Sequence, residues 1–263
     1  MRLNKFISHN SKYSRREADR LIEAGEVKIN KKVIHEFGYE VQSNDQVTLK
    51  NKPIKPKKQG ELTVVIYNKP KGVLVTKKDD RGRATIYHKL PGKYRNFMPI
   101  GRLDYASEGL LLLTDAPEVA EALMTSDLPR TYNIKIDKPV TQVMIDAMKG
   151  GLHLEDASAG AHERSHIRSM DFAPFASFEL RGQTGKYTKL RVTITEGKNR
   201  ELRRFFAHFD ATVVDLKRVA FWGIELNNLP TNKTRYFTRR EYDDLHKLLK
   251  KSQKKEKRDA PST

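Results

Sequence analysis

Residues 101–114 read GRLDYASEGLLLLT, in which a charged segment is followed by a glycine and four leucines. A short apolar run that follows a glycine is typical of a buried strand. The segment therefore places Arg102 and Asp104 at the mouth of a buried strand in the main domain. Their spacing alone favours a plain interpretation, in which they form a structural ion pair or Asp104 caps a turn.

On both sides of this segment, strands and helices interleave without the regular βαβ period. This pattern predicts an α+β domain over residues 61–238, with a mainly antiparallel mixed sheet flanked by helices. The predicted strands cover residues 62–67, 73–76, 110–113, 132–136 and 187–194. The predicted helices cover residues 117–125, 141–149 and 201–209.

Residues 1–50 form a separate small α/β module. A short helix is indicated at its start, and a second helix follows Ser14, because Ser14 and Glu17 have the spacing of a capping box. Gly25 ends this helix, since glycine accepts the left-handed conformation of a helix cap. Short strands are predicted over residues 27–34 and 46–49. The two helices carry a candidate RNA-facing patch, which consists of Arg2, Lys5, Arg15, Arg16 and Arg20.

Two further segments have compositions that argue against a packed core. Residues 51–60 are basic and interrupted by prolines, which indicates a linker. Residues 239–263 begin as a basic helix and continue into a run of lysines with too little apolar surface to fold alone. We therefore expect the end of the chain to be disordered.

The composition restricts the function. The chain of 263 residues has a formal net charge of +18, and its 37% hydrophobic residues suffice for a core. Such a charge excess favours a polyanionic partner, because Lys and Arg that neutralise phosphates release counterions. A membrane surface is less favoured, since we find no helix with a large apolar face and no lipidation signal.

Several kinds of site are excluded or disfavoured. The absence of cysteine excludes disulfides, thiolate metal sites and cysteine nucleophiles. His162 and His166 have helical spacing but no HExxH pattern, so we expect no metal. No apolar run approaches ~18 residues and the first residues lack an apolar signal core, which predicts a cytoplasmic protein.

A second informative segment, residues 196–206, places a basic helix directly after a strand. Helix starts bind phosphate through free N–H groups. The side chains that would strengthen such binding are Lys198, Arg200, Arg203 and Arg204. The plain alternative is an amphipathic surface helix with Leu202, Phe205 and Phe206 turned inward. A third segment begins a strand with Arg130 and Tyr132, where a tyrosine most often serves packing.

These segments resemble one enzyme family. Residues 101–114 resemble the GRLD…GLLLLT signature of the bacterial pseudouridine synthases typified by the small-subunit enzyme A, and residues 68–72 match their NKPxG segment. Residues 1–50 resemble the S4 RNA-binding module that precedes the catalytic domain in that family. Details within residues 82–91, 151–156 and 196–204 look closest to the branch of the large-subunit synthase B. Residues 9–13 depart from the family's usual Ala-Gly turn.

The resemblance implies site-specific isomerisation of uridine to pseudouridine in ribosomal RNA, with large-subunit 23S rRNA as the expected substrate. The family's nucleophile maps to Asp104, and its basic partner maps to Arg203, which would offset burial and orient the carboxylate. Tyr132 matches the active-site tyrosine, which stacks on the base and serves in proton transfer. Arg102 matches the arginine that flips the base out of stacked RNA. The reaction involves neither redox chemistry nor phosphoryl transfer, so no cofactor is expected.

Two alternatives stay open at this point. The main one is a non-catalytic S4-type RNA-binding or ribosome-assembly protein. A more distant one is a metal-dependent RNA hydrolase that uses the pairs Asp79-Asp80 or Asp243-Asp244, which lie in turn or tail contexts. The sequence identifies neither the target uridine nor whether Asp104 attacks the base or the ribose. No large apolar stripe indicates an obligate dimer, so we predict a monomer.

Overall fold

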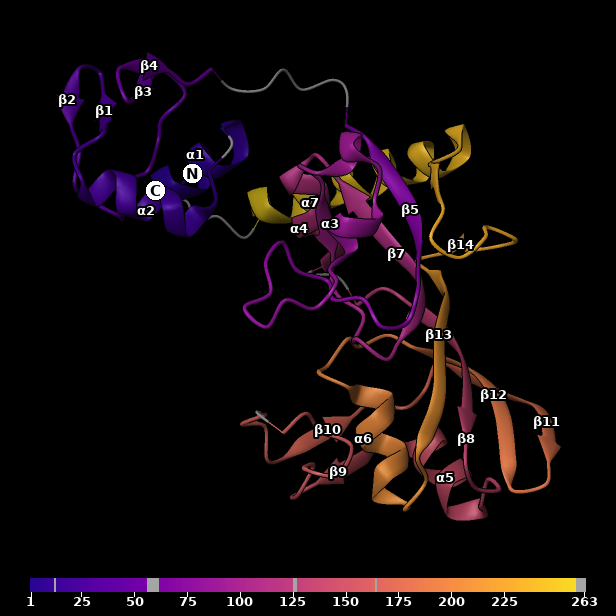
Figure 1. Cartoon of the computed structure of the whole chain (residues 1–263). Helices are drawn as coiled ribbons and strands as arrows, with labels where there is room; N and C mark the ends of the chain where they lie inside the picture. Colours follow the sequence, from indigo (N-terminus) through magenta and orange to yellow (C-terminus); the bar gives the residue numbers. More distant parts are fainter. Residues whose placement is uncertain (12, 56–61, 125–126, 164, 259–263) are drawn as a thin grey trace. The chain divides into compact units, whose positions relative to one another are not determined.

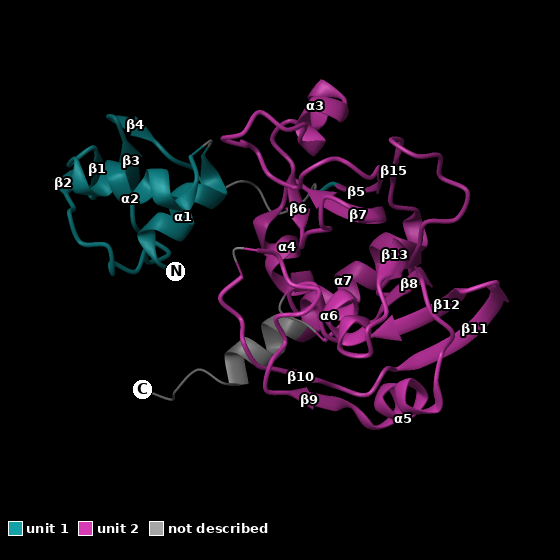
Figure 2. Cartoon of the chain, turned by 60° about the horizontal axis from the view of Figure 1, so that its bottom comes forward, with its two compact units in different colours: residues 1–63 teal, residues 64–263 magenta. Residues whose placement is uncertain are grey.

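The computed structural model shown in Figure 1 describes the backbone of all residues except 12, 56–61, 125–126, 164 and 259–263, and no side chains over 252–258. The chain divides into two compact units, Met1–Thr63 and Val64–Thr263 (Figure 2). Strand β4 (Lys52–Pro53) pairs with β3 (Val47–Leu49). The first residues of the predicted linker therefore belong to the sheet of the first unit.

The first unit packs two helices against a small sheet. Helices α1 (Leu3–Asn10) and α2 (Arg15–Glu23) accompany a sheet of order β2-β1-β3-β4, in which β1 is Val27–Ile29 and β2 is Lys32–Val33. The predicted capping box is confirmed, because Ser14 accepts from the Glu17 backbone and Glu17 accepts from the Ser14 backbone. The core consists of Leu3, Ile7, Ala18, Ile22, Val27, Ile29, Val47 and Leu49.

The second unit contains a mixed sheet, in which the structure describes nine strands. Its main order is β11 (Ser177–Thr184), β12 (Tyr187–Ile194), β8 (Arg130–Ile136), β13 (Val213–Phe221), β7 (Glu108–Thr114), β5 (Val64–Lys69) and β15 (Thr234–Tyr236). In addition, β6 (Met98–Ile100) pairs with β7, and β14 (Ile224–Glu225) pairs with β13. Only the β13–β7 pair is parallel among these described strands. The predicted α+β fold with a mainly antiparallel sheet is confirmed.

Helices and a small second sheet surround this sheet. The helices are α3 (Ile86–Lys89), η1 (Gly92–Tyr94), α4 (Pro117–Met124), α5 (Gln142–Gly150), α6 (Glu201–His208) and α7 (Arg239–Arg258). The small sheet pairs β9 (Leu152–Leu154) with β10 (Met170–Phe172). Leu202, Phe205 and Phe206 of α6 belong to the main core, as the amphipathic pattern predicted.

The four leucines of residues 110–113 are fully buried in β7. Leu111 and Leu113 join the main core, while α4 contacts β6 and β7. A strand covered on both faces needs a continuous apolar run rather than an alternating one. The leucine run therefore fixes β7 inside the sheet, and the charged segment before it emerges at the strand's beginning.

Strand β13 joins the two halves of the sheet, since it lies between β8 and β7 (Figure 1). The sequence pattern does not predict this strand, because Asp215, Lys217 and Arg218 interrupt its apolar residues. Gly109 is the point of closest approach: its φ is +105°, and a Cβ there would lie 2.2 Å from the carbonyl oxygen of Arg218. A glycine is therefore required where β7 meets β13.

Two predictions about local structure were wrong. Residues 73–76 form no strand; only an isolated bridge joins Leu74 to Thr85. Helix α7 runs to Arg258, through basic residues for which we expected disorder. Lys, Glu and Gln are good helix formers, and a helix that is nucleated on its packed first turns, where Leu245 is buried, extends at little cost. The last part of the predicted tail lies outside the described residues.

Gly109→Ala should lower the free energy of unfolding by more than about 2 kcal/mol, since the added methyl group meets the β13 backbone and strains φ. Chemical denaturation of the full chain measures this effect. Gly92→Ala is the matched control, because nothing lies within 4 Å of a Cβ at Gly92. Equal unfolding midpoints for the two variants would contradict the close approach of the strands.

Candidate active site

Asp104 lies on a tight turn that leads into β7. The Ser107 N–H donates to the carbonyl oxygen of Asp104 at 3.0 Å, which closes the turn. The Asp104 side chain is 36% exposed and lines a cavity of about 870 Å³ in the second unit. The backbone of Asp104 is therefore fixed, while its carboxylate is accessible to a molecule in the cavity.

Lys69 holds this turn from inside the protein. Lys69 is fully buried at the end of β5, and its Nζ donates to the carbonyl oxygens of Pro70, Asp104 and Ser107 at 3.0, 3.1 and 2.8 Å. Burial lowers the pKa of Lys69 to about 8, and the charges of Asp104 and Glu108 oppose that change. A buried ammonium group is stable only with such partners, so the turn and the lysine stabilise each other.

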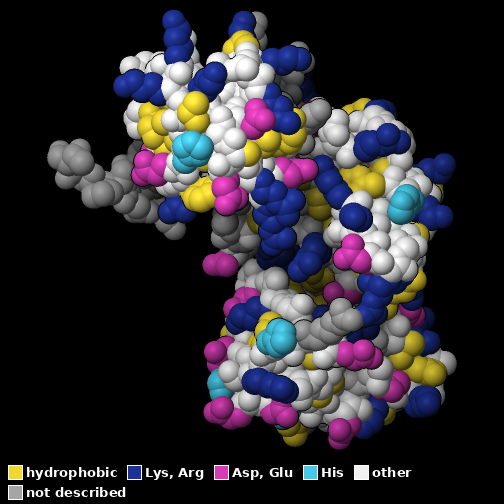
Figure 3. Space-filling model, turned by 60° about the vertical axis from the view of Figure 1, so that its left-hand side comes forward, with side chains coloured by type: hydrophobic (Ala, Val, Ile, Leu, Met, Phe, Trp, Pro, Cys, Tyr) yellow, Lys and Arg dark blue, Asp and Glu magenta, His cyan; other side chains and the backbone are white. Residues whose placement is uncertain are grey.

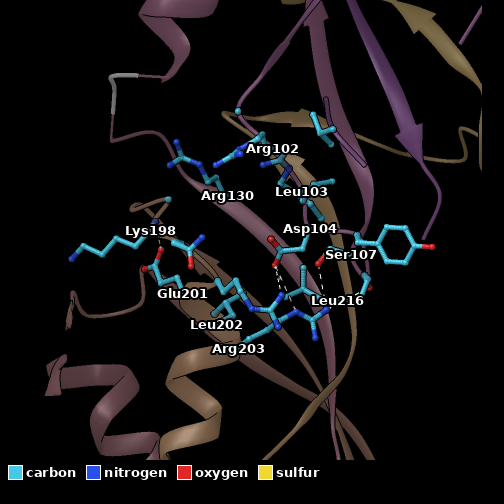
Figure 4. Close-up of a pocket in the computed structure, with 18 of the residues that line it drawn as sticks. Arg102, Leu103, Asp104, Ser107, Arg130, Lys198, Glu201, Leu202, Arg203 and Leu216 are labelled. Atoms are coloured by element: carbon cyan, nitrogen blue, oxygen red, sulfur yellow. Dashed lines mark hydrogen bonds and ion pairs between the residues drawn. The ribbon is translucent and has the colours of Figure 1, made fainter. Parts of the chain in front are cut away.

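The Asp104 carboxylate faces two guanidinium groups. Its Oδ2 lies 3.3 Å from Nη1 of Arg200 and 3.9 Å from Nε of Arg203. Dashed lines in Figure 4 mark the contacts of Asp104. Nε of Arg203 is buried with no hydrogen-bond partner among the described residues. The family resemblance implied Arg203 alone as the partner of Asp104; the structure places Arg200 closer.

Backbone carbonyls fix both guanidinium groups. Arg203 donates to the carbonyl oxygen of Val213 at 2.8 Å and to Oγ of Ser107 at 3.3 Å. Arg200 precedes α6 in a left-handed conformation, with φ of 52°, and its Nε donates to the carbonyl oxygen of Gly160 at 2.7 Å. Because each guanidinium also donates to a backbone carbonyl, the groups that face Asp104 have little freedom to turn away.

Tyr132 and Arg102 also line the cavity. Tyr132 is only 8% exposed and lies on β8 opposite Arg218 of β13. Arg102 is exposed and forms no ion pair or hydrogen bond with the residues described by the structure. Figure 4 shows Arg102 and Arg130 on one side of Asp104, with Arg203 on the other. The cavity thus brings together the four side chains that the resemblance implied, on three separate segments of the chain.

Glu201 is a buried acid in the same cavity that the sequence analysis did not assign. It is 5% exposed, and its carboxylate accepts from the backbone N–H of Lys198 at 3.0 Å, which caps the start of α6. Burial raises the pKa of the Glu201 carboxyl to about 7, against the lowering effect of that hydrogen bond. The spacing of Lys198 and Glu201 in the sequence is compatible with a helix cap, but the burial of the Glu201 side chain depends on the packing of α6.

The structure corrects the expectation for Arg204, which was predicted to contact RNA. Arg204 is fully buried and is not among the residues that line the cavity. Its guanidinium donates to the carbonyl oxygens of Asn199 and Ala157 and to Oγ of Ser165. Arg204 therefore ties the segment before α6 to the loop that follows β9. It points away from Arg203, because adjacent residues on a helix point in different directions.

The remaining predicted RNA contacts are Lys198 and the basic patch of the first unit, and they differ in whether their charged groups have partners or are exposed. Lys198 lines the cavity, but its ammonium pairs with Glu196 at 2.8 Å and donates to the carbonyl oxygen of Asp171 at 2.6 Å. In the first unit the side chains of Arg2, Arg15, Arg16 and Arg20 are exposed, and that of Lys5 is half-buried. Figure 3 shows Lys and Arg side chains, in dark blue, over much of the face in view, with acidic side chains scattered among them.

The described part of the chain offers neither a metal-binding cluster nor a membrane-spanning helix. No three His, Asp or Glu side chains among the described residues are placed so that they could hold a metal ion. Within the same residues, no helix combines the length and the apolar character needed to cross a membrane.

Comparison with known proteins decides the family. A family model described as RNA pseudouridylate synthase matches residues 63–208, and one described as S4 domain matches residues 1–47. The chain belongs to the RNA pseudouridylate synthase family. It is therefore an enzyme that isomerises uridine in RNA, with the expected S4 domain in front of the catalytic unit.

Relatives span nearly the whole chain. An uncharacterized RNA pseudouridine synthase of Helicobacter pylori is 50% identical over 95% of both chains. The ribosomal large subunit pseudouridine synthase B of Bacillus subtilis is 32% identical over 94% of this synthase and 96% of its own length. The dual-specificity RNA pseudouridine synthase RluF of Escherichia coli is 32% identical over 96% of this chain and 80% of its own. A crystal structure of a pseudouridylate synthase shares the fold, with a TM-score of 0.63 and 24% identity over 94% and 99% of the two chains.

Glu201→Gln should become more stable than the wild type as the pH rises from 4.5 through 7. The folded pKa of Glu201 lies above that of the unfolded chain, so the folded wild type binds more protons in this window and loses stability as the pH rises. The difference should reach about 3 kcal/mol above pH 7. Denaturation at a series of pH values measures it, and a difference that does not change with pH would show that Glu201 ionises normally.

Proposed function

We propose that the protein isomerises a specific uridine in ribosomal RNA, that its substrate is large-subunit 23S rRNA, and that Asp104 is the nucleophile. The observation that carries the role of Asp104 is that its carboxylate, on a fixed turn at an open cavity, faces two guanidinium groups. The choice of substrate rests on the Bacillus subtilis relative, whose name specifies the large ribosomal subunit.

The reaction sets clear requirements for this cavity. The N1–C1′ bond of uridine breaks, the uracil turns, C1′ bonds to C5, and the proton at C5 is lost while N1 gains one. Asp104 supplies the nucleophile, and the guanidinium groups of Arg200 and Arg203 orient its carboxylate. Tyr132 lies where it can stack on the base and serve in proton transfer. Arg102, which has no described partner, fills the space that the flipped nucleotide leaves in the RNA stack.

The remaining features agree with an RNA substrate of large size. The exposed arginines of the S4 domain add phosphate contacts, and each such contact increases the salt dependence of binding. We propose that the protein acts as a monomer without a cofactor, and that it works in the cytoplasm, where ribosomal RNA is assembled.

Pseudouridine mapping of ribosomal RNA from cells with and without this chain tests the proposed function directly. One uridine of the large-subunit RNA should lose its modification when the protein is absent and regain it when the wild-type chain is restored. Loss of a small-subunit site would refute the substrate, and an unchanged map in both RNAs would refute ribosomal RNA as the target.

Asp104→Asn should abolish isomerisation and leave RNA affinity nearly unchanged. Asparagine keeps the size of the side chain but removes the negative charge that faces Arg200 and Arg203. Single-turnover assays and filter binding with the same rRNA transcript separate the two properties. Turnover within a few-fold of the wild type would remove Asp104 from the nucleophile role.

Arg203→Lys should lose much of the single-turnover rate at saturating RNA, and Arg203→Ala more, because lysine lacks the planar fork of arginine. Arg200→Ala should have a similar effect, since Arg200 lies closer to the carboxylate than Arg203 does.

A phosphate contact on α6 would behave differently, because its loss weakens RNA binding and responds to salt. If Arg203→Ala reduced affinity but kept the saturated rate, the pairing of Arg203 with Asp104 would be wrong. Arg181→Ala is the control for both arginines, since Arg181 lies on β11 in an exposed ion pair with Glu179.

A further inference from the structure

One wall of the cavity carries two arginines that the chemistry at Asp104 leaves unused. Arg130 on β8 and Arg218 on β13 lie on neighbouring strands, and both line the cavity. Their guanidinium carbons lie 5.0 and 5.5 Å from the ring centroid of Phe221. Two like charges are thus gathered around one aromatic ring.

Each of these guanidinium groups is anchored on one side and keeps donors on the other. Nη1 of Arg130 donates to the carbonyl oxygens of Leu128 and Thr195 at 2.7 and 2.8 Å. Nε of Arg218 donates to the carbonyl oxygen of Leu110 at 2.7 Å, and its Nη2 is buried with no partner in the described part of the chain. Arg218 itself is only 4% exposed.

No acidic side chain compensates this charge at short range. Among the described residues, neither Arg130 nor Arg218 forms an ion pair with a carboxylate. Burial, together with the charge of Arg218, lowers the pKa of Arg130, while Glu201 and Asp127 oppose this change from a distance. A buried or half-buried cation without a counter-charge is costly, and a protein that keeps two such cations side by side is suited to an anion.

The backbone makes room for this arrangement. A Cβ at Gly197 would lie 3.3 Å from Cζ and Nε of Arg130, so the glycine allows the guanidinium to lie flat against the chain. The planar fork of a guanidinium group matches the oxygens of a phosphate and binds them in pairs. Two guanidinium groups that are already held in place by backbone carbonyls suit a single phosphate group better than a neutral base.

Resting on the proposed function, we propose that Arg130 and Arg218 together bind one phosphodiester of the RNA strand beside the flipped uridine. Flipping rotates a nucleotide about its own backbone, so the adjoining phosphates approach the mouth of the pocket that receives the base. Arg102 reaches into the cavity on the same side as Arg130 (Figure 4), next to the path of that strand. The site would position the strand and would not touch the reacting atoms.

The salt dependence of RNA binding tests this proposal. The probe is a labelled RNA hairpin with an all-uridine loop, and its binding to the full chain is measured by fluorescence anisotropy over a range of salt concentrations. The double variant Arg130→Gln/Arg218→Gln should reduce the slope of log K against log salt by about 0.7, the value for one contact with a single strand. Arg218→Lys should retain the slope, because it keeps the charge.

Arg181→Gln is the matched control, since it removes one charge from an exposed arginine outside the cavity. It should leave the slope unchanged. If the double variant kept the wild-type slope, or lost affinity without a change in slope, the arginines would contact a neutral group such as a uracil carbonyl and the proposal would be wrong. Should Arg218→Gln fail to fold, Arg130→Gln alone should still flatten the slope, because Arg130 is only half-buried.

Pseudouridine formation, assayed separately on an rRNA transcript, keeps this test distinct from that of the proposed function. A flattened slope in the double variant supports the phosphate site even if the wild-type chain modifies no uridine in that transcript. An unchanged slope rejects the site even if the wild-type chain is fully active.

Discussion

The buried ammonium group of Lys69 donates three hydrogen bonds, to the carbonyl oxygens of Pro70, Asp104 and Ser107. These bonds join the end of β5 to the turn that begins β7, and so they place the Asp104 carboxylate relative to the sheet. The turn cannot shift without leaving a buried cation unpaired, which would cost several kcal/mol. The position of the Asp104 carboxylate thus follows from a constraint inside the fold.

The arginines in and near the cavity fall into three groups according to their interaction partners. Arg200 and Arg203 face the carboxylate, Arg204 is a buried structural link, and Arg130 and Arg218 have no carboxylate partner among the described residues. The positive net charge of the chain therefore does not arise from a uniform basic surface in this unit. It is distributed over groups that orient one acid, groups that hold loops, and groups that are left for an anion.

The sequence predicted the parts of this arrangement that depend on local pattern. The leucine run of β7, the capping box of α2 and the segment with Asp104 could be recognised because each has a short, fixed spacing. It did not predict β13, because Asp215, Lys217 and Arg218 interrupt the apolar pattern of that strand. Of these three residues Arg218 is buried, and its burial depends on pairing with distant strands. For the same reason Lys69 and Arg218 were overlooked, and Arg204 was misplaced: which side of α6 faces the cavity is set by Phe205 and Phe206 in the core.

The central claim is that Lys69 positions Asp104 for chemistry, and Lys69→Met tests it most directly. Methionine is close to lysine in length and apolar, so it can fill the buried space without the hydrogen bonds. The measurement is the single-turnover rate of pseudouridine formation at saturating rRNA, at a temperature where the variant is folded by circular dichroism. The account predicts a rate at least about tenfold below the wild type, equivalent to ~1.4 kcal/mol, with RNA affinity unchanged. A folded variant that reacts at the wild-type rate would contradict it.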